Sequence, residues 1–260
     1  MPHHVSSLQY WRTISKQMDL FEFPKYFSRL WVRQKSADKK FMHWLSYLFP
    51  QAIFRASSKY NHDIRVIEEH GKYKLLVNGS RQSGAYIEML WKEAFKSFGL
   101  PQSHLQEDLL QILVLGVAGG TVIHLLREMY SDALIVGVDI DTSMIAIGRT
   151  YFGLSDMKNV TLLQGDAQRF VADARRQNVR YDAIVVDLFL GRTIPSFVKN
   201  PSFLFLLKSI LSRDGWMVMN YLRELEYEKQ SQTLEASLKK IFSNVSDFSI
   251  VRNRFFSVVQ

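Results

Sequence analysis

Cysteine is absent from this chain of 260 residues, which excludes disulfide bonds and any zinc site that depends on thiolate ligands. Long apolar runs are also missing: no stretch of about 20 apolar residues occurs, so the sequence predicts no transmembrane helix. The first residues lack a cleavable signal pattern, because Arg12, Lys16 and Asp19 interrupt any apolar run. These absences favour a globular protein of a reducing compartment, and we expect it in the cytoplasm.

Positive charge is concentrated at the N-terminal end. The chain has a net charge of +8, and residues 1–60 contain ten Lys and Arg against three Asp and Glu. The same segment holds thirteen of the thirty-four aromatic residues, whereas the rest of the chain is close to neutral. This asymmetry predicts two functional parts.

Apolar periodicity gives a coarse map of the fold. Residues 1–57 are expected to be helical and irregular, and two strand-like runs, Ile64–Glu68 and Tyr73–Val77, then form a predicted hairpin. A helix is expected over Tyr86–Phe98. From Leu110 onward strands and helices alternate, which predicts a mostly parallel sheet covered on both faces, a Rossmann-like α/β fold. The expected strands are Ile112–Leu115, Leu134–Val138, Val160–Leu163, Ala183–Val186 and Trp216–Met219, followed by an antiparallel pair, Phe248–Val251 and Phe255–Val259.

A small-residue loop, Gly116–Thr121, follows the first of these strands and opens a helix. Such a loop lets the backbone approach a ligand, and the helix N-terminus offers free N–H groups. Asp139 ends the next strand, twenty-three residues after Gly116, where a carboxylate can accept the ribose hydroxyls of an adenosine. Ala118 and Thr121 depart from the glycine pattern of dinucleotide sites, which favours a cofactor without a pyrophosphate.

Carboxylates also end the following two strands. Asp166 follows the third strand and Asp187 the fourth. Ligands of open α/β sheets bind at the carboxyl ends of strands, so three successive acidic strand ends predict a ligand site there. Asp166 also suits the N-cap of the helix that begins at Ala167, and the two roles are compatible.

These motifs resemble those of the spermidine synthase family of polyamine aminopropyltransferases. Leu113–Thr121 (LVLGVAGGT) is similar to its glycine motif, Gly137–Asp141 (GVDID) to its ribose-binding strand end, and Tyr181–Asp187 (YDAIVVD) to its catalytic strand. Gly165-Asp166-Ala167 resembles its adenine-binding turn. The resemblance covers roughly residues 58–260 and also includes Ser58-Lys59-Tyr60, Gln82 and Tyr86–Leu90 (YIEML).

The resemblance implies a class I S-adenosylmethionine-dependent transferase fold with a seven-stranded sheet, a small N-terminal β-hairpin region and a helical N-terminal extension. It divides the chain into a basic aromatic-rich extension (1–57), a small β-strand region with the first helix (58–105) and a catalytic domain (106–260). It implies S-adenosylmethionine or its decarboxylated form as cofactor, no metal, and a small-molecule amine as acceptor. Asp187 would be the catalytic base. Cofactor contacts would come from Gly116, Ala118, Gly119, Asp139, Ile140, Asp166, Ala167 and Gln82, and acceptor contacts from Tyr86 and Leu190.

Two departures from the family pattern leave the reaction open. Ala118 stands where the family has an aspartate, and Leu190 where it usually has a second acidic residue. Aminopropyl transfer in polyamine biosynthesis is the leading hypothesis. Methyl transfer from S-adenosylmethionine to another acceptor is the first alternative, because losing an acidic group removes a partner of the cationic tail. A non-catalytic cofactor-binding scaffold is the second.

Three explanations compete for residues 1–57. The aromatics can pack onto the catalytic domain or onto a second subunit of a homodimer, the reading that we favour because aromatic-rich helices are usually core. The segment can instead lie in a membrane interface, where cationic side chains meet anionic lipid. Nucleic-acid binding is the least favoured, since the segment carries no recognised motif.

Overall fold

The computed structural model describes residues 43–100, 110–224 and 226–260. By internal packing they form two units: residues 43–51 with 68–72, and residues 52–67 with the described residues from 73 to 260. The larger unit contains the seven-stranded sheet and all residues of the site described below. None of the helices in the described ranges combines the length and apolar character needed to cross a membrane.

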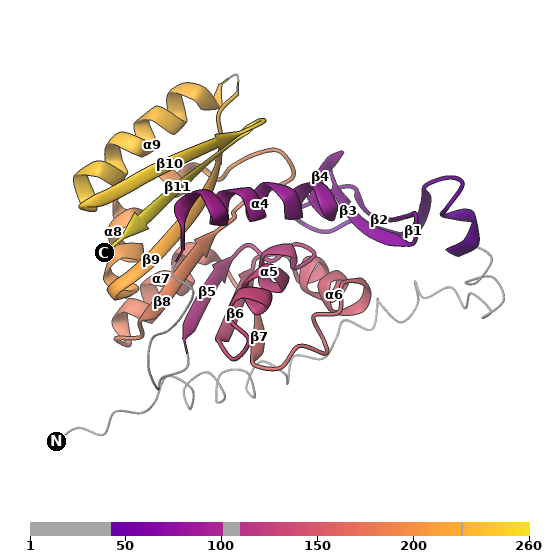
Figure 1. Ribbon diagram of the computed structural model, residues 1–260, viewed down its shortest axis with the longest axis horizontal. Helices are drawn as coiled ribbons and strands as arrows, with labels where there is room; N and C mark the ends of the chain where they lie inside the picture. Colours follow the sequence, from indigo (N-terminus) through magenta and orange to yellow (C-terminus); the bar gives the residue numbers. More distant parts are fainter. Residues whose placement is uncertain (1–42, 101–109, 225) are drawn as a thin grey trace. The chain divides into compact units, whose positions relative to one another are not determined.

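A seven-stranded sheet organises the larger unit, with the strand order β10-β11-β9-β8-β5-β6-β7 (Figure 1). Its central strands pair in parallel, and β11 lies antiparallel between β9 and β10. The predicted Rossmann-like α/β fold with a mostly parallel seven-stranded sheet is therefore confirmed. The strands are β5 (Gln111–Leu115), β6 (Leu134–Asp139), β7 (Val160–Gln164), β8 (Tyr181–Val186), β9 (Leu211–Leu222), β10 (Asn244–Ile250) and β11 (Asn253–Val259).

Helices cover the sheet, and this explains why its central strands are apolar without alternation. Ile112, Leu113, Val114 and Leu115 of β5 are all fully buried. Alternate residues of the strands share one core with buried side chains of α4, α5 and α6, and there Trp91 of α4 packs edge-on against Phe255 at a centroid distance of 4.9 Å. The helices are α4 (Ala85–Phe98), α5 (Thr121–Met129), α6 (Thr142–Tyr151), α7 (Ala167–Arg176), α8 (Pro201–Ile210) and α9 (Tyr227–Ile241), with a 3-10 turn η1 (Ser196–Lys199).

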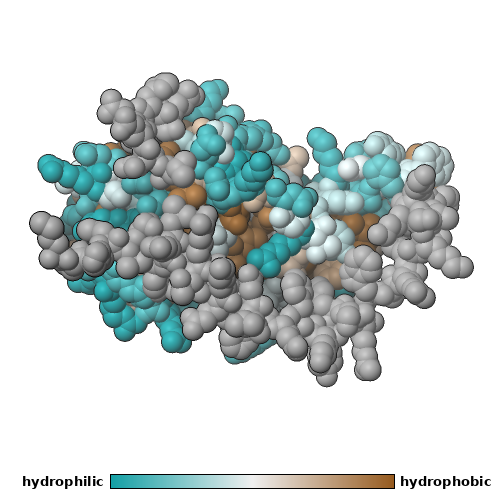
Figure 2. Space-filling view, turned by 90° about the horizontal axis from the view of Figure 1, so that it is seen from below, coloured by the Kyte–Doolittle hydropathy of each residue, from teal (hydrophilic) through white to brown (hydrophobic). Residues whose placement is uncertain are grey.

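The surface of the larger unit, over the described residues, exposes few large apolar side chains, as expected when the apolar strands and helix faces are buried. On the face seen in Figure 2 the visible residues are mostly hydrophilic, and apolar residues gather in a limited area near the middle of the view. Large exposed apolar side chains of the larger unit are few and scattered, for example Met89, Phe205 and Val251. Scattered exposure of this kind is normal for a globular protein.

A four-stranded sheet with the order β1-β2-β3-β4 precedes α4. Its strands are β1 (Gln51–Ala56), β2 (Ile64–Glu69), β3 (Lys72–Val77) and β4 (Ser80–Ser83). β2 and β3 confirm the predicted hairpin. β1 was not predicted, and it corrects the expectation that residues up to 57 are helical and irregular: Gln51–Ala56 is a six-residue strand at one edge of this sheet. Residues 1–42 of the predicted extension lie outside the described residues.

The smaller unit is a short helical turn with the tip of the β2–β3 hairpin. The His43 ring and the Glu68 carboxyl group form a hydrogen bond, and the hydroxyl of Ser46 accepts a hydrogen bond from the Gly71 N–H at 3.2 Å. Four apolar side chains in this unit are each more than half exposed: Trp44, Tyr47, Leu48 and Phe49. The explanations offered for residues 1–57 all stay predictions.

Candidate functional site

The site lies where the sheet reverses its strand order. β5 is followed in the chain by β6 but pairs with β8 on its other side, so a crevice opens beyond the carboxyl ends of β5 and β8. The glycine loop follows β5, Asp139 ends β6, Asp166 follows β7 and Asp187 follows β8. The topology thus brings together at one edge the loop and the three acidic residues that the sequence singled out.

Asp139 holds the glycine loop in place. Its Oδ2 accepts hydrogen bonds from the Val117 N–H at 2.9 Å and the Ala118 N–H at 3.2 Å, and its Oδ1 accepts one from the Asp141 N–H at 2.9 Å. Burial raises the pKa of Asp139, and the three backbone donors partly offset this. A carboxylate has about four acceptor positions, so only about one stays free for a ligand. We therefore expect Asp139 to accept a hydrogen bond from one ribose hydroxyl and not from both.

Two glycines of the loop are fixed by close packing. A Cβ on Gly116, whose φ is +93°, would lie 2.1 Å from the backbone oxygen of Asp187, so only glycine lets the ends of β5 and β8 approach this closely. Gly119 lies against β4: its N–H donates to Ser83 Oγ at 2.9 Å, and a Cβ there would meet the same oxygen at 2.5 Å. Gly119 does not belong to the lining of either cavity described next, although the sequence assigned it to the cofactor.

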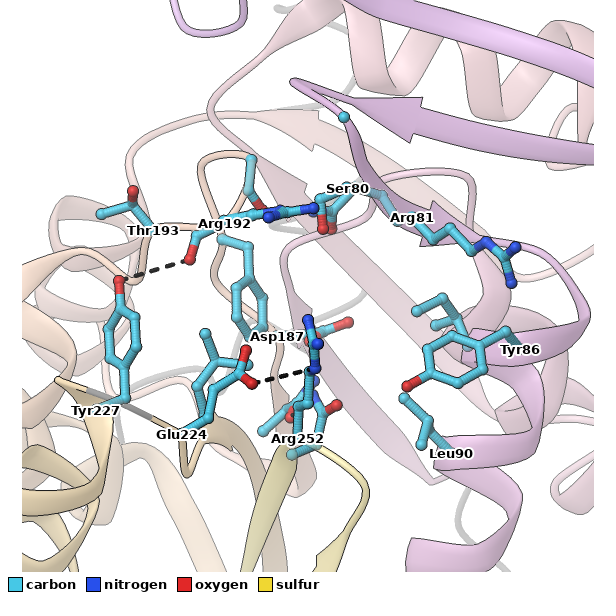
Figure 3. A pocket seen from close by; sticks show the side chains of 18 of the residues that line it. Ser80, Arg81, Tyr86, Leu90, Asp187, Arg192, Thr193, Glu224, Tyr227 and Arg252 are labelled. Carbon is cyan, nitrogen blue, oxygen red and sulfur yellow. Dashed lines mark hydrogen bonds and ion pairs between the residues drawn. The ribbon is translucent and has the colours of Figure 1, made fainter.

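Two cavities meet at Asp187. The smaller, of about 130 Å³, contains the predicted cofactor residues Gly116, Ala118, Asp139, Ile140, Asp166 and Ala167. The larger, of about 550 Å³, contains Tyr86, Asn220, Glu224, Tyr227 and Arg252 (Figure 3). Asp187, Gln82, Phe189 and Gly191 line both. A molecule bound in one cavity and a second molecule bound in the other would therefore both lie beside Asp187.

Asp187 is poised to exchange a proton near neutral pH. The pKa of Asp187 is raised to about 6, mainly by burial in the crevice and to a smaller extent by the charge of Asp139. The side chains of Asn220, whose Nδ2 donates to Asp187 Oδ1 at 2.9 Å, and of Trp91 work in the opposite direction. A carboxylate with a raised pKa is a stronger base than an exposed one and is still mostly ionised at pH 7. This combination, at the junction of two cavities, is typical of a functional carboxylate.

The remaining predicted residues divide between structural and cavity-lining positions. Gln82 links β4 to the loop after β8, since its Nε2 donates to the Gly191 carbonyl at 2.7 Å. Asp166 is the N-cap of α7 and accepts the Arg169 N–H at 2.9 Å, as the capping interpretation predicted. Tyr86, which was assigned to the acceptor, lines the larger cavity. Leu190 was assigned to the same role, but it lines the smaller cavity with the cofactor residues.

Sequence reasoning gave no role to the polar residues that support these positions. The predicted strand Trp216–Met219 stops short of Asn220, whereas β9 continues to Leu222, so Asn220 is a buried strand residue beside Asp187. A lone Asn inside the apolar run WMVMNYL was the available signal. Asp141 also had no assigned role: it caps α6 and its Oδ2 accepts Ser58 Oγ at 2.5 Å and Asn61 Nδ2 at 2.9 Å.

Metal ligands do not gather in the described ranges, where no group of three or more His, Asp or Glu side chains is arranged to hold an ion. The lining of the smaller cavity instead suits a nucleoside. Asp139 and Asp166 lie at successive strand ends, and Ile140, Leu188 and Phe197 supply apolar surface for a planar base.

Comparison with known proteins places residues 92–256 within the model of the spermine/spermidine synthase domain. The chain is 30% identical over 141 residues to the polyamine aminopropyltransferase of Vibrio vulnificus, an alignment that covers 54% of this chain and 46% of the relative. It is 27% identical over 157 residues to the eEF1A lysine and N-terminal methyltransferase homolog of Drosophila pseudoobscura, covering 58% of this chain and 22% of that one. The chain thus spans less than half the length of these curated relatives.

Solved structures show the same fold. Human methyltransferase-like protein 13 in complex with SAH matches with a TM-score of 0.52 and 25% identity, over 58% of this chain and 72% of that chain. A spermidine synthase in complex with the transition state analogue AdoDATO matches with a TM-score of 0.57 and 14% identity, over 80% of this chain and 72% of that one. These likenesses confirm the predicted class I S-adenosylmethionine-dependent transferase fold.

Proposed function

The chain belongs to the spermine/spermidine synthase family, and from this premise we propose that it is a transferase that alkylates an amine with S-adenosylmethionine or its decarboxylated form. Aminopropyl transfer to a small-molecule amine, a step of polyamine biosynthesis, is the reaction that we put first. The observation that carries the proposal is the position of Asp187, a carboxylate with a pKa of about 6 between the smaller cavity, which the predicted cofactor residues line, and the larger cavity, which is open to an acceptor.

The cofactor would be held by the smaller cavity. We assign one ribose hydroxyl to the free acceptor position of Asp139 and the exocyclic amine of the base to Asp166. Ile140, Ala167 and Leu188 would contact the base, and Gly116 and Ala118 would let the backbone approach the ligand. When bound, the cofactor supplies an electrophilic carbon attached to a positively charged sulfur.

Asp187 would activate the acceptor. The amine nitrogen must lose its proton to expose the lone pair that forms the new C–N bond as the C–S bond breaks and the thioether leaves. Asp187 takes that proton, and Asn220 holds the carboxylate in place. Asp187 and Glu226, which line the larger cavity, would attract a cationic amine, and the walls on both sides of Asp187 would set the two reactants in line.

Methyl transfer is the second candidate, and one observation favours it. Ala118 lines the smaller cavity where the resembling family has an aspartate, so that acidic partner of the cofactor's tail is missing. The larger cavity includes Arg81 and Arg192, which could attract the carboxylate that only the intact cofactor carries. The likeness to an eEF1A lysine and N-terminal methyltransferase homolog supports an amine of a protein as acceptor in that case.

Titration calorimetry with both cofactors separates the candidates. Tighter binding of decarboxylated S-adenosylmethionine is expected for aminopropyl transfer, tighter binding of the intact form supports methyl transfer, and binding of neither leaves the scaffold hypothesis. Ala118→Asp is the informative variant: Ala118 has φ +47°, a conformation that Asp tolerates better than Ala. It should shift the preference towards the decarboxylated form by about tenfold, the value of one charge-assisted hydrogen bond.

Asp139→Ala should weaken cofactor binding by about ten- to a hundred-fold, because one charged hydrogen bond to the ribose is lost and the loop is released. The variant should also unfold at a lower temperature, since three backbone N–H groups lose their acceptor. Asp139→Asn, which keeps one side-chain oxygen, should lie between wild type and Asp139→Ala in both measurements. Unchanged affinity in Asp139→Ala would remove the adenosine site from this strand end.

A further inference from the structure

Two hydrogen bonds in series connect the hairpin β10–β11 to Asp187. Asn253 Nδ2 donates to Asn220 Oδ1 at 2.9 Å, and Asn220 Nδ2 donates to Asp187 Oδ1 at 2.9 Å. The three side chains come from β11, from β9 and from the end of β8, which are neighbours in the sheet. Asn220 is only 7% exposed, so the connection runs through the buried wall of the larger cavity.

A primary amide has a donor end and an acceptor end of nearly the same shape, and its neighbours decide which end faces which way. Asn220 can donate its NH₂ group to an ionised Asp187, or it can turn its carbonyl oxygen to accept the proton of a neutral Asp187. Because Asn253 offers an N–H to Asn220, the Asn220 carbonyl oxygen turns to Asn253 and its NH₂ group turns to the carboxylate. Asn253 thus favours the orientation in which the Asn220 side-chain amide, bonded to both residues, turns its NH₂ group to Asp187.

We propose that Asn253 is a positioning residue that keeps the donor end of Asn220 on Asp187, so that the carboxylate is oriented and favoured in its ionised form. The inference rests on the proposed function of Asp187 as the base. Asn253 acts through Asn220 and is not itself assigned a contact with the reacting atoms. It extends the catalytic arrangement to a residue thirty-three positions away from Asn220 in the chain.

The hairpin turn that carries Asn253 is held in an unusual conformation. Val251 has φ +52°, which is strained for a β-branched residue, and its side chain is 60% exposed. The next residue, Arg252, pairs with Glu224 at 3.1 Å (Figure 3). The Arg252 carbonyl accepts a hydrogen bond from the Arg223 N–H at 3.0 Å. Contacts on the β9 side therefore hold the turn, and strain of this kind persists where neighbouring structure enforces it.

Other charged groups near Asp187 bear on its titration. Asp139 at the end of β6 raises the pKa of Asp187. The remaining charged or titratable residues that line the larger cavity are Arg81, Tyr86, Arg192, Glu224, Glu226, Tyr227 and Arg252. Asn253 carries no charge, so Asn253→Ala leaves all these charges in place. The variant therefore tests only the orientation of the Asn220 side-chain amide.

The test is a carboxylate ¹³C NMR titration of Asp187 in the full-length protein, with the signal assigned from Asp187→Asn. Asn253→Ala lets the Asn220 amide turn over, and we expect the midpoint of Asp187 to rise by about one pH unit. Asn253→Asp should raise it more, because a carboxylate at 253 demands the donor end of Asn220 and leaves its oxygen facing Asp187. The acidic limb of the kcat/KM profile should move with it.

The matched control is Asn244→Asp, an exposed position at the other end of the same hairpin, which should leave the Asp187 midpoint unchanged. Asn253→Ser, which keeps a donor of shorter reach, should titrate between wild type and Asn253→Ala, and it serves as the second variant if Asn253→Asp does not fold. An Asp187 midpoint that stays at its wild-type value in folded Asn253→Ala or Asn253→Ser overturns the proposal. A midpoint that moves in a protein that transfers nothing supports the relay and contradicts the proposed function.

Discussion

Asp187→Asn should abolish most of the transfer and leave cofactor binding nearly intact. Asn keeps the shape of the side chain and can still accept the hydrogen bond from Asn220, but it cannot take a proton from the acceptor amine. General-base assistance is typically worth about 10²–10⁴ in rate, so kcat should fall by that factor while the calorimetric affinity for cofactor changes little. Product formation followed by mass spectrometry measures the first and titration calorimetry the second.

The pH dependence of the wild type provides an internal check. Since the pKa of Asp187 is raised to about 6, the base is protonated below that pH, and kcat should rise with pH through this region. Asp156→Asn, at an exposed position away from the crevice, is the matched control and should leave rate and profile unchanged. An Asp187→Asn protein that turns over at the wild-type rate would exclude Asp187 as the base.

The same substitution should stabilise the fold at neutral pH. A carboxyl group whose pKa is higher in the folded than in the unfolded protein binds more protons when folded, so wild-type stability decreases as pH rises from about 4 to about 6. Asp187→Asn removes this cost, and its free energy of unfolding at pH 7 should exceed that of wild type by about 1–3 kcal/mol. The difference should vanish near pH 3, where both side chains are neutral.

Periodicity was sufficient to predict the sheet and the edge on which the site lies. Continuous apolar runs ending in Asp139, Gly165-Asp166 and Asp187 require buried parallel strands whose carboxyl ends meet. The family resemblance then supplied roles for these residues. What neither could supply were the partners of each side chain: Asp139 uses most of its acceptor positions on the glycine loop, and Gly119 donates to Ser83, thirty-six residues earlier in the chain.

The supporting residues depend on tertiary pairing that local patterns do not encode. The strand predicted over Trp216–Met219 ended at Asn220, whereas β9 continues through this residue to Leu222, and no local pattern gave the amide a partner. Its position is stable because β11 inserts between β9 and β10 and brings Asn253 within hydrogen-bonding distance. β1 was missed for a related reason: its burial pattern depends on the sheet that it joins, and its sequence, QAIFRA, follows a segment of mixed aromatic and basic residues.

Gly116→Ala should have the largest effect on stability of the variants considered, because two penalties coincide at this glycine. The added Cβ would lie 2.1 Å from the backbone oxygen of Asp187, and φ +93° is unfavourable for any residue with a Cβ. Overpacking and a forced left-handed conformation each cost about 1–3 kcal/mol, so the free energy of unfolding should fall by about 3–5 kcal/mol. Urea denaturation of wild type and variant measures the difference.

Gly153→Ala separates the two penalties, because Gly153 has a similar left-handed φ of +69° but nothing lies within 4 Å of its Cβ position. This control should lose only the conformational part, about 1 kcal/mol. If Gly116→Ala folds, relief of the clash must move the end of β8, which carries Asp187. Transfer should then fall by about a hundred-fold or more, since a displacement of about 1 Å in a reacting group has that cost. Equal stabilities of the two variants would show that β5 and β8 do not meet as closely as the structure has them, and would remove the steric reason for glycine at the start of the loop.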